Sequence, residues 1–132
     1  MASDGYLLAF DFGLRHIGVA AGQTVTATAS PVTTLRAAGG KPRWPEVLEL
    51  IEAWKPVRLL VGLPLNMDGT ESDMSGQART FAAALERRTG TPTELVDERL
   101  STREASGQGG GHALAAALIA ETWLGERRHR SG

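Results

Sequence analysis

Short apolar runs open this chain, and helical repeats of apolar residues follow them. Two runs, 6–11 and 17–22, flank a short turn that contains glycine, and β-branched residues continue the pattern over 24–28 and 32–35. Runs of this length and composition are typical of strands, and a short turn between two of them favours a hairpin. The beginning of the chain therefore predicts three antiparallel strands.

Helices and strands alternate in the rest of the chain. A helical repeat over 44–54 precedes a short apolar strand over 58–62. A second helical repeat begins near Thr70 or Ser72, which are both good N-cap residues. Another strand, 94–98, ends in two acidic residues. Helical repeats of this kind bury one face against a sheet, so these segments predict strand-helix units.

The C-terminal part carries a last helix. A glycine-rich break over 107–111 leads into it at His112, and the residues over 113–124 are apolar on nearly all sides, so we expect this helix to lie buried against the sheet. The polar tail 126–132 is expected to fray. The order βββαβαβα predicts an α/β fold with a mixed five-stranded sheet, helices on both faces, and a single domain over 1–132.

Composition narrows the class of protein. There are 14 Lys and Arg residues against 15 Asp and Glu residues, and the net charge of -1 argues against a tight binder of nucleic acid that relies on charge alone. The sequence contains no cysteine, which excludes disulfides and thiolate zinc sites and fits a reducing compartment. It shows no basic leader and no long apolar span, so we expect a cytoplasmic protein that does not bind membranes.

Asp11 is the main candidate for chemistry because it ends the first apolar run. An ionised carboxylate at the end of a buried strand is costly unless a metal, a cation or backbone N–H groups compensate its charge. The simplest alternative is an Asp that closes the hairpin turn through its own backbone. Two other strands also end in residues that bear on this choice, and both alternatives stay open at this point.

Gly62 and the pair Asp97-Glu98 end those two strands. If the strand that ends at Gly62 lies between the other two, Asp11 and Glu98 are two strand spacings apart, roughly 9–10 Å between backbones, and two inward-leaning carboxylates can hold one cation. Gly62 leaves that space open. An oxygen-rich site of this kind suits Mg²⁺ or Mn²⁺ in phosphodiester hydrolysis. Asp97 is a candidate beside Glu98.

The residues of several motifs, and the order of these motifs along the chain, indicate one family. The chain resembles the YqgF (RuvX) family of Holliday-junction resolvase-like proteins, also described as pre-16S rRNA nucleases, through the segments LAFDFGLRHIGVA, VGLPLNMDGTESDMSGQARTFAAAL and VDERLST, which an Ala-rich helix follows. The resemblance implies an RNase H-like fold, a bacterial cytoplasmic location, divalent-metal nuclease chemistry and a role in processing the 5′ end of ribosomal RNA. It also implies that Asp11 and Glu98 are the first two acids of the metal site, and that the start of the last helix supplies the third.

His112 stands where the family usually has that third acid. No carboxylate follows within the first helical turn, and Glu121 lies about 13 Å further along the axis on the opposite face. A neutral imidazole at a helix N-terminus is able to bind a divalent metal and suits Mn²⁺ better than Mg²⁺. The alternative is an ordinary helix-start residue that binds no metal. Metal preference and catalytic competence therefore depend on His112.

A few polar residues are expected to contact nucleic acid. Arg15, which follows Asp11 by four residues, is the strongest candidate for a phosphate clamp. Asn66 lies in a loop that either contacts substrate or only forms a turn before a helix cap. The basic residues 127–130 form either a nucleic-acid arm or a solubilising end. The expected binding set is Arg15, Asn66, Arg99 and Arg103; for Arg99 and Arg103 the alternative is a solvated surface side chain or an ion pair with Glu98.

These residues leave two classes of function open. In the first, the chain is a metal-dependent endonuclease that uses Asp11, Glu98 and His112, with Asp97 as a further candidate, on pre-rRNA or branched DNA. In the second, His112 weakens catalysis and the same fold serves as a nucleic-acid-binding or ribosome-assembly factor. An ATP-binding domain of the actin and hexokinase type fits the length less well, since those enzymes close two such domains around the nucleotide. Resolving a symmetric junction requires a homodimer with two sites, whereas trimming an RNA end requires only a monomer.

Overall fold

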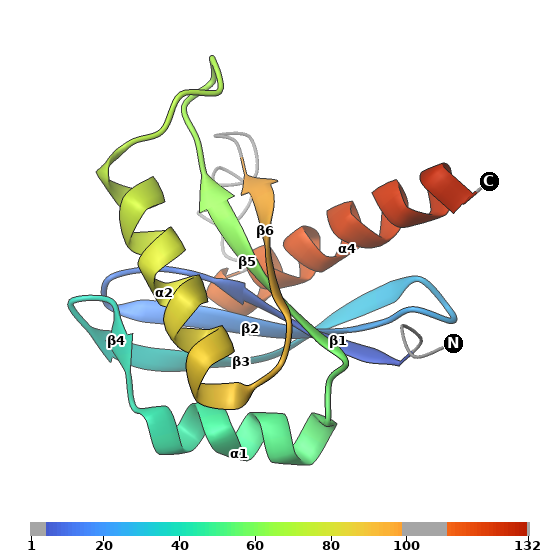
Figure 1. Cartoon of the computed structure of the whole chain (residues 1–132), viewed down its shortest axis with the longest axis horizontal. Helices are drawn as coiled ribbons and strands as arrows, with labels where there is room; N and C mark the ends of the chain where they lie inside the picture. Colours follow the sequence, from blue (N-terminus) through green and yellow to red (C-terminus); the bar gives the residue numbers. More distant parts are fainter. Residues whose placement is uncertain (1–4, 99–110, 132) are drawn as a thin grey trace.

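The computed structural model describes residues 5–98 and 111–131 and has a mixed sheet at its centre (Figure 1). Its six strands lie in the order β4-β3-β2-β1-β5-β6. In chain order the elements are β1 (Tyr6–Asp11), β2 (His16–Gln23), β3 (Thr28–Ala38), β4 (Lys41–Pro42), α1 (Trp44–Trp54), β5 (Arg58–Pro64), α2 (Asp73–Thr89), β6 (Thr93–Glu98) and α4 (Gly111–Ser131). The strands from β4 to β1 pair antiparallel, whereas β5 runs parallel to both β1 and β6. The predicted α/β class, the mixed sheet and the three antiparallel strands at its start are confirmed.

The sheet has one strand more than the five that the sequence predicts. The additional strand is β4, whose Lys41 and Pro42 pair with Ala38 and Ala37 at the end of β3. The two glycines between them, 39–40, have φ values of +59° and +83°. Positive φ at both central residues is the backbone of a tight hairpin turn, which glycine adopts without strain. This Gly-Gly pair therefore turns the chain back into the sheet rather than only ending a strand.

The bounds of β3 also differ from expectation. Residues 24–27 form a turn, in which the amide of Ala27 donates to the carbonyl of Gln23 at 2.8 Å and the φ of Ala27 is +57°. Strand pairing with β2 begins at Thr28, and β3 continues to Ala38. The β-branched residues at 24–28 suit a strand, but the chain must reverse there to pair with β2. The return of the hairpin overrides the local preference of those side chains.

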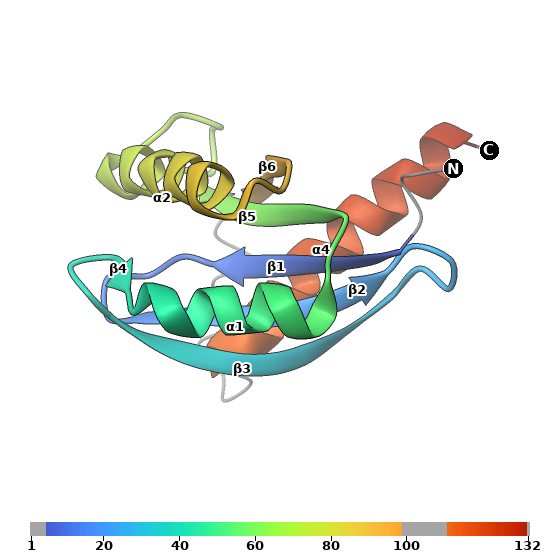
Figure 2. The ribbon, with the colours of Figure 1, turned by 60° about the horizontal axis from the view of Figure 1, so that its bottom comes forward.

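Helices cover both faces of the sheet, as the sequence predicts (Figure 2). α1 and α2 lie on one face, where Phe81 of α2 packs against strand residues such as Phe10 and Val61. α1 occupies the predicted range 44–54, and α2 begins directly after one of its two predicted N-cap residues, Ser72. The core on this face anchors the strand ends that carry the candidate site.

α4 crosses the other face and lies very close to β2. Gly18, Ala20 and Gly22 line the side of β2 that faces α4, and α4 meets them with small residues such as Ala116. Small residues on both surfaces let the helix backbone approach the sheet closely. The expected packing of the last helix on the sheet is confirmed, but the helix continues to Ser131, beyond its apolar segment. None of the helices in the described residues is long and apolar enough to cross a membrane.

Candidate active site

Asp11 is the last residue of β1, at the carboxyl end of a central strand. Leu7 and Ala9 of the same strand are buried in the core beneath α4. Side chains alternate along a strand, so Asp11 lies on the α4 face as well. Its side chain is 14% exposed. The carboxylate is therefore largely withdrawn from water but still accessible at the end of the sheet.

Two glycines flank Asp11 in the sheet. Gly18 is its direct partner on β2, and Gly62 is the next residue along β5 on the other side. A Cβ atom at Gly18 would lie 1.9 Å from the carbonyl oxygen of His112, and a Cβ atom at Gly62 would lie 2.6 Å from Oε1 of Glu98. The space that two side chains would fill is taken by the first turn of α4, by the side chain of Ile119 and by the Glu98 carboxylate. The absence of side chains beside Asp11 brings these groups toward it.

Glu98, rather than Asp97, shares the face of Asp11. Glu98 ends β6 opposite Pro64 of β5 and is only 4% exposed, whereas Asp97 is exposed. Glu98 follows Val96, which is buried beneath α4, by two residues and so points to the same face. The strand order places β5 between β1 and β6, which is the condition on which the expected spacing of the two acids rests. The two acids therefore project from strands separated by two spacings, roughly 10 Å.

His112 lies at the start of α4, above the end of β1. Its Nδ1 atom is 3.9 Å from Oδ2 of Asp11. Its ring also stacks on the ring of His16, with 5.1 Å between centroids and an angle of 19° between planes. His16 is the first residue of β2, and no sequence pattern singles it out. The imidazole of His112 is 49% exposed, so it is open to a ligand as well as close to the first acid.

The residues expected to bind nucleic acid are distributed unevenly. Arg15 is exposed in the turn between β1 and β2, close in sequence to Asp11. The side-chain amide of Asn66 donates to Oγ1 of Thr70 at 2.9 Å, and Asp68 accepts from the amide and hydroxyl of Thr70. This network is what the turn interpretation of the loop predicts. Arg99 and Arg103 lie outside the described residues.

The donor atoms on this face suit a hard divalent cation. Mg²⁺ and Mn²⁺ accept one or two protein carboxylates and complete their coordination with water and phosphate oxygens. Asp11 and Glu98 are two such carboxylates, and His112 adds an imidazole beside the first. Within the described residues, no group of three His, Asp or Glu side chains is arranged to hold a single ion.

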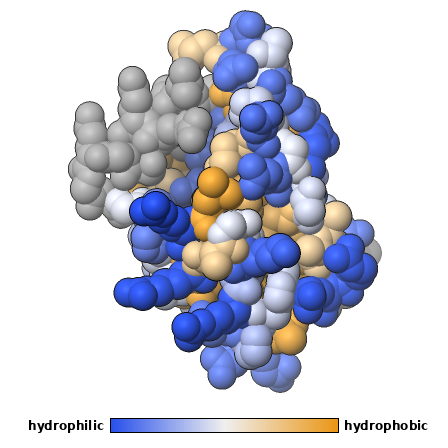
Figure 3. Space-filling view, turned by 90° about the vertical axis from the view of Figure 1, so that its left-hand side faces the viewer, coloured by the Kyte–Doolittle hydropathy of each residue, from blue (hydrophilic) through white to orange (hydrophobic). Residues whose placement is uncertain are grey.

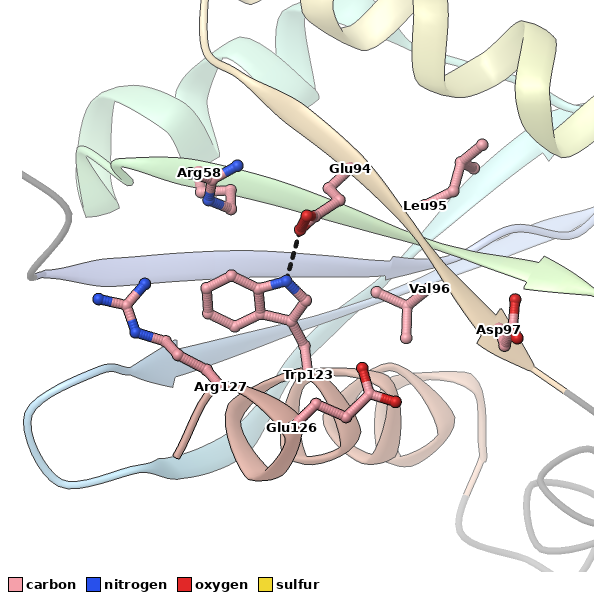
Figure 4. Close-up of a pocket in the computed structure, with 8 residues that line it drawn as sticks. All are labelled: Arg58, Glu94, Leu95, Val96, Asp97, Trp123, Glu126 and Arg127. Carbon is pink, nitrogen blue, oxygen red and sulfur yellow. Dashed lines mark hydrogen bonds between the residues drawn. The ribbon is translucent and has the colours of Figure 1, made fainter. Parts of the chain in front are cut away.

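Asp97 belongs to a different region, a groove of about 590 Å³ along the outer edge of β6 (Figure 4). The indole N–H of Trp123 on α4 donates to Glu94 on β6. The guanidinium groups of Arg58 and Arg127 lie 5.7 Å and 5.4 Å from the centre of the Trp123 ring. Both acidic and basic side chains line this groove, and Glu94, Arg58 and Arg127 contact Trp123. The contacts of Trp123 connect the edge strand β6 to α4, and the mixed charges of the groove do not favour a ligand of either charge.

Comparison with solved structures defines the class of fold. Two structures of RuvC from Thermus thermophilus match the chain. The one in complex with Holliday junction substrate has a TM-score of 0.60 and 13% sequence identity, and the match covers 94% of this chain and 96% of RuvC. The other has a TM-score of 0.55 and 14% sequence identity. At this identity the likeness shows the fold alone. RuvC is RNase H-like, so the predicted RNase H-like fold is confirmed.

The chain belongs to the RuvX family, as its motifs indicate. The family model, described as Holliday junction resolvase, matches residues 5–126. A relative from Azotobacter vinelandii is 47% identical in an alignment that covers 96% of this chain and 98% of the relative. A relative from Sodalis glossinidius is 45% identical, covering 94% of this chain and 96% of the relative. One from Cronobacter sakazakii is 55% identical over 76% of this chain and 73% of its own length. All three carry the name "Putative pre-16S rRNA nuclease".

Proposed function

We propose that this chain is a metal-dependent endonuclease that processes the 5′ end of pre-16S rRNA in the bacterial cytoplasm. The observation that carries the proposal is the pair of carboxylates, Asp11 and Glu98, on one face of the sheet at the ends of β1 and β6. The names of relatives that are 45–55% identical support ribosomal RNA as the substrate. Holliday-junction-like DNA, which the family description names, is the alternative substrate.

Each residue of the site has a distinct part in this mechanism. Asp11 and Glu98 would hold a divalent cation, which supplies a Lewis acid and an activated water for attack on phosphorus when it is bound. Burial keeps the carboxylate of Glu98 fixed in direction, because the surrounding core encloses it in the space that Gly62 leaves open. His112 stands beside Asp11 and orients a water or a phosphate oxygen from the start of α4. Arg15, which is exposed in the turn after β1, would contact a neighbouring phosphate.

The oligomeric state follows from the substrate. Trimming one RNA end requires a single active site, so a monomer is sufficient for the proposed reaction. Cutting a junction symmetrically would require two copies of Asp11 in one homodimer. The partner in the proposed reaction is a ribosomal precursor, and binding to a membrane is not part of the proposal.

A cleavage assay with purified protein tests the proposal. A pre-16S rRNA fragment that keeps its 5′ extension is incubated with the chain in Mg²⁺, in Mn²⁺ or with a chelator, and a four-way DNA junction serves as the second substrate. We expect cleavage near the mature 5′ end with either metal, and no cleavage with the chelator. Intact RNA in both metals, with a folded protein, would contradict the proposal. Preference for the junction would replace the RNA substrate by DNA.

His112 supports a second candidate function, a nucleic-acid-binding or ribosome-assembly factor with weakened catalysis. Replacing it tests how much the imidazole limits the site. We expect His112→Asp to raise the rate in Mg²⁺ relative to the rate in Mn²⁺, because a carboxylate is a harder ligand than an imidazole. His112→Asn is the neutral control, and single-turnover rates in the two metals are the measurement. If His112→Asp gains cleavage that the natural chain lacks in both metals, the binding factor is the better description.

A further inference from the structure

We propose that the groove between β4, α1 and α2 binds an unpaired nucleotide of the substrate, with the base against Trp44 and the phosphates against Lys41, Arg87 and Arg88. This inference rests on the proposed function and refines it, because it specifies a single-stranded segment next to the cleavage site. The groove has a volume of about 360 Å³, within the range of about 300–1,000 Å³ that small-ligand sites occupy.

The charges of this groove favour a phosphate-bearing ligand. Three cationic side chains line it, those of Lys41, Arg87 and Arg88, and none of the described lining residues is acidic. The chain as a whole has a net charge of -1, so this cluster is a local excess. The groove along β6 differs in this respect, because Glu94 and Asp97 lie among its lining residues. Charge complementarity therefore directs a polyanion to the groove beside β4.

The aromatic residues supply a surface for a base. Phe81 is the centre of the cluster: its ring lies 5.3 Å from that of Phe12 and 6.2 Å from that of Trp44, nearly parallel to the latter at 28°. Phe12 and Phe81 are buried, whereas Trp44 is half-buried at the wall of the groove. The guanidinium of Arg88 lies 4.6 Å from the centre of the Trp44 ring, so it must turn from the ring toward a phosphate when a base takes its place. Stacking on such a ring is tolerant of sequence, since every base has a π face.

The groove is joined to the candidate active site through consecutive residues. Asp11 faces α4, and Phe12, the next residue, belongs to the core on the α1 and α2 face and lines the groove. A nucleic-acid strand that crosses the end of β1 therefore meets the carboxylates on one side and the groove on the other. The side of the molecule that bears β4 shows exposed hydrophobic side chains bordered by strongly hydrophilic ones (Figure 3). Such a surface suits a base and its phosphates together.

Binding of a fluorescently labelled oligouridylate, measured by anisotropy with a chelator present, tests the groove without cleavage. We expect Trp44→Leu to weaken binding about tenfold without changing the dependence of binding on salt, because it removes stacking and no charge. Arg88→Ala should lower the slope of log affinity against log salt by about 0.7, the value for one phosphate contact on a single strand. Lys55→Ala removes the same charge from an exposed ion pair with Glu52 and should leave both quantities unchanged.

The outcomes separate this inference from the proposed function. Equal affinities of the natural chain, Trp44→Leu and Arg88→Ala would overturn the groove as a binding site and leave the nuclease untouched. Equal losses in Arg88→Ala and Lys55→Ala would also overturn it, since general charge would then explain binding. Thermal denaturation checks that Trp44→Leu folds, and Trp44→Phe, which keeps a ring, should restore most of the affinity. A fully paired RNA duplex should bind all variants alike.

Discussion

Replacing Asp11 by asparagine is expected to reduce metal-dependent cleavage by about three orders of magnitude, as loss of several kcal/mol of metal-based stabilisation of the transition state implies. The substitution keeps the size of the side chain and removes its charge. An amide is a poor ligand for a divalent cation, and neither glycine beside it, Gly18 or Gly62, provides a side chain in its place. The measurement is the single-turnover rate on pre-16S rRNA across a series of Mn²⁺ concentrations.

Two neighbouring residues on β6 provide a matched test of the same site. Glu98→Gln should also abolish most of the cleavage, because Glu98 shares the face of Asp11, whereas Asp97→Asn should leave the rate unchanged, because Asp97 is exposed on the other side of the strand. Urea denaturation establishes that each variant is folded before its rate is compared. Equal losses in both variants would mean that the two acids act together or that the face of β6 is wrongly assigned.

The positions of the strands could be predicted from the sequence because each apolar run is short and has polar or turn-forming residues at its ends. The run that ends at Asp11, the run that ends at Gly62 and the segment over 94–98 all became strands, and their order in the sheet is the one on which the spacing of the acids depended. The pattern of apolar residues identifies strands well when both faces are buried, since almost every residue of the strand is then apolar. A polar residue at the end of such a strand therefore stands out in the sequence as a candidate site residue.

The choice between Asp97 and Glu98 could not be made from the sequence, because adjacent residues of a strand differ only by the face on which they lie. The register, in which Glu98 pairs with Pro64, puts Glu98 on the buried face that it shares with Asp11 and leaves Asp97 exposed. A shift of one residue would exchange the two side chains. His16 escaped notice for a similar reason: only the approach of α4 brings His112 against it.

The close approach of α4 to β2 also has a signal in the sequence, but the pattern of apolar and polar residues does not reveal it. Gly18, Ala20 and Gly22 alternate with the larger buried residues Ile17 and Val19 along β2. Alternate small residues mark one face of a strand as a surface for close backbone contact. Average hydrophobicity treats these residues as one apolar run. It therefore indicates a buried strand but does not show that one face carries small residues and the other carries large ones.

Gly18→Ala is expected to have the largest effect on stability, although it adds only one methyl group. Its Cβ atom would lie 1.9 Å from the carbonyl oxygen of His112 and 2.7 Å from the amide nitrogen of Ala113, both of which are backbone atoms that no rotamer change moves aside. The first turn of α4 must shift away from β2, and overpacking of this kind costs about 1–3 kcal/mol. Urea denaturation measures the loss in the free energy of unfolding.

The same substitution tests how the site is assembled. Moving the start of α4 takes His112 away from Asp11, which it now approaches to 3.9 Å, so cleavage should fall even under conditions where Gly18→Ala remains folded. Gly125→Ala, on α4 where a Cβ atom meets nothing within 4 Å, is the control and should raise stability by up to about 1 kcal/mol, as alanine does in place of glycine within a helix. Natural stability and cleavage in Gly18→Ala would show that α4 does not need this contact. A loss of cleavage larger than the loss of stability explains would instead identify Gly18 as the residue that sets the distance between the helix and the first acid.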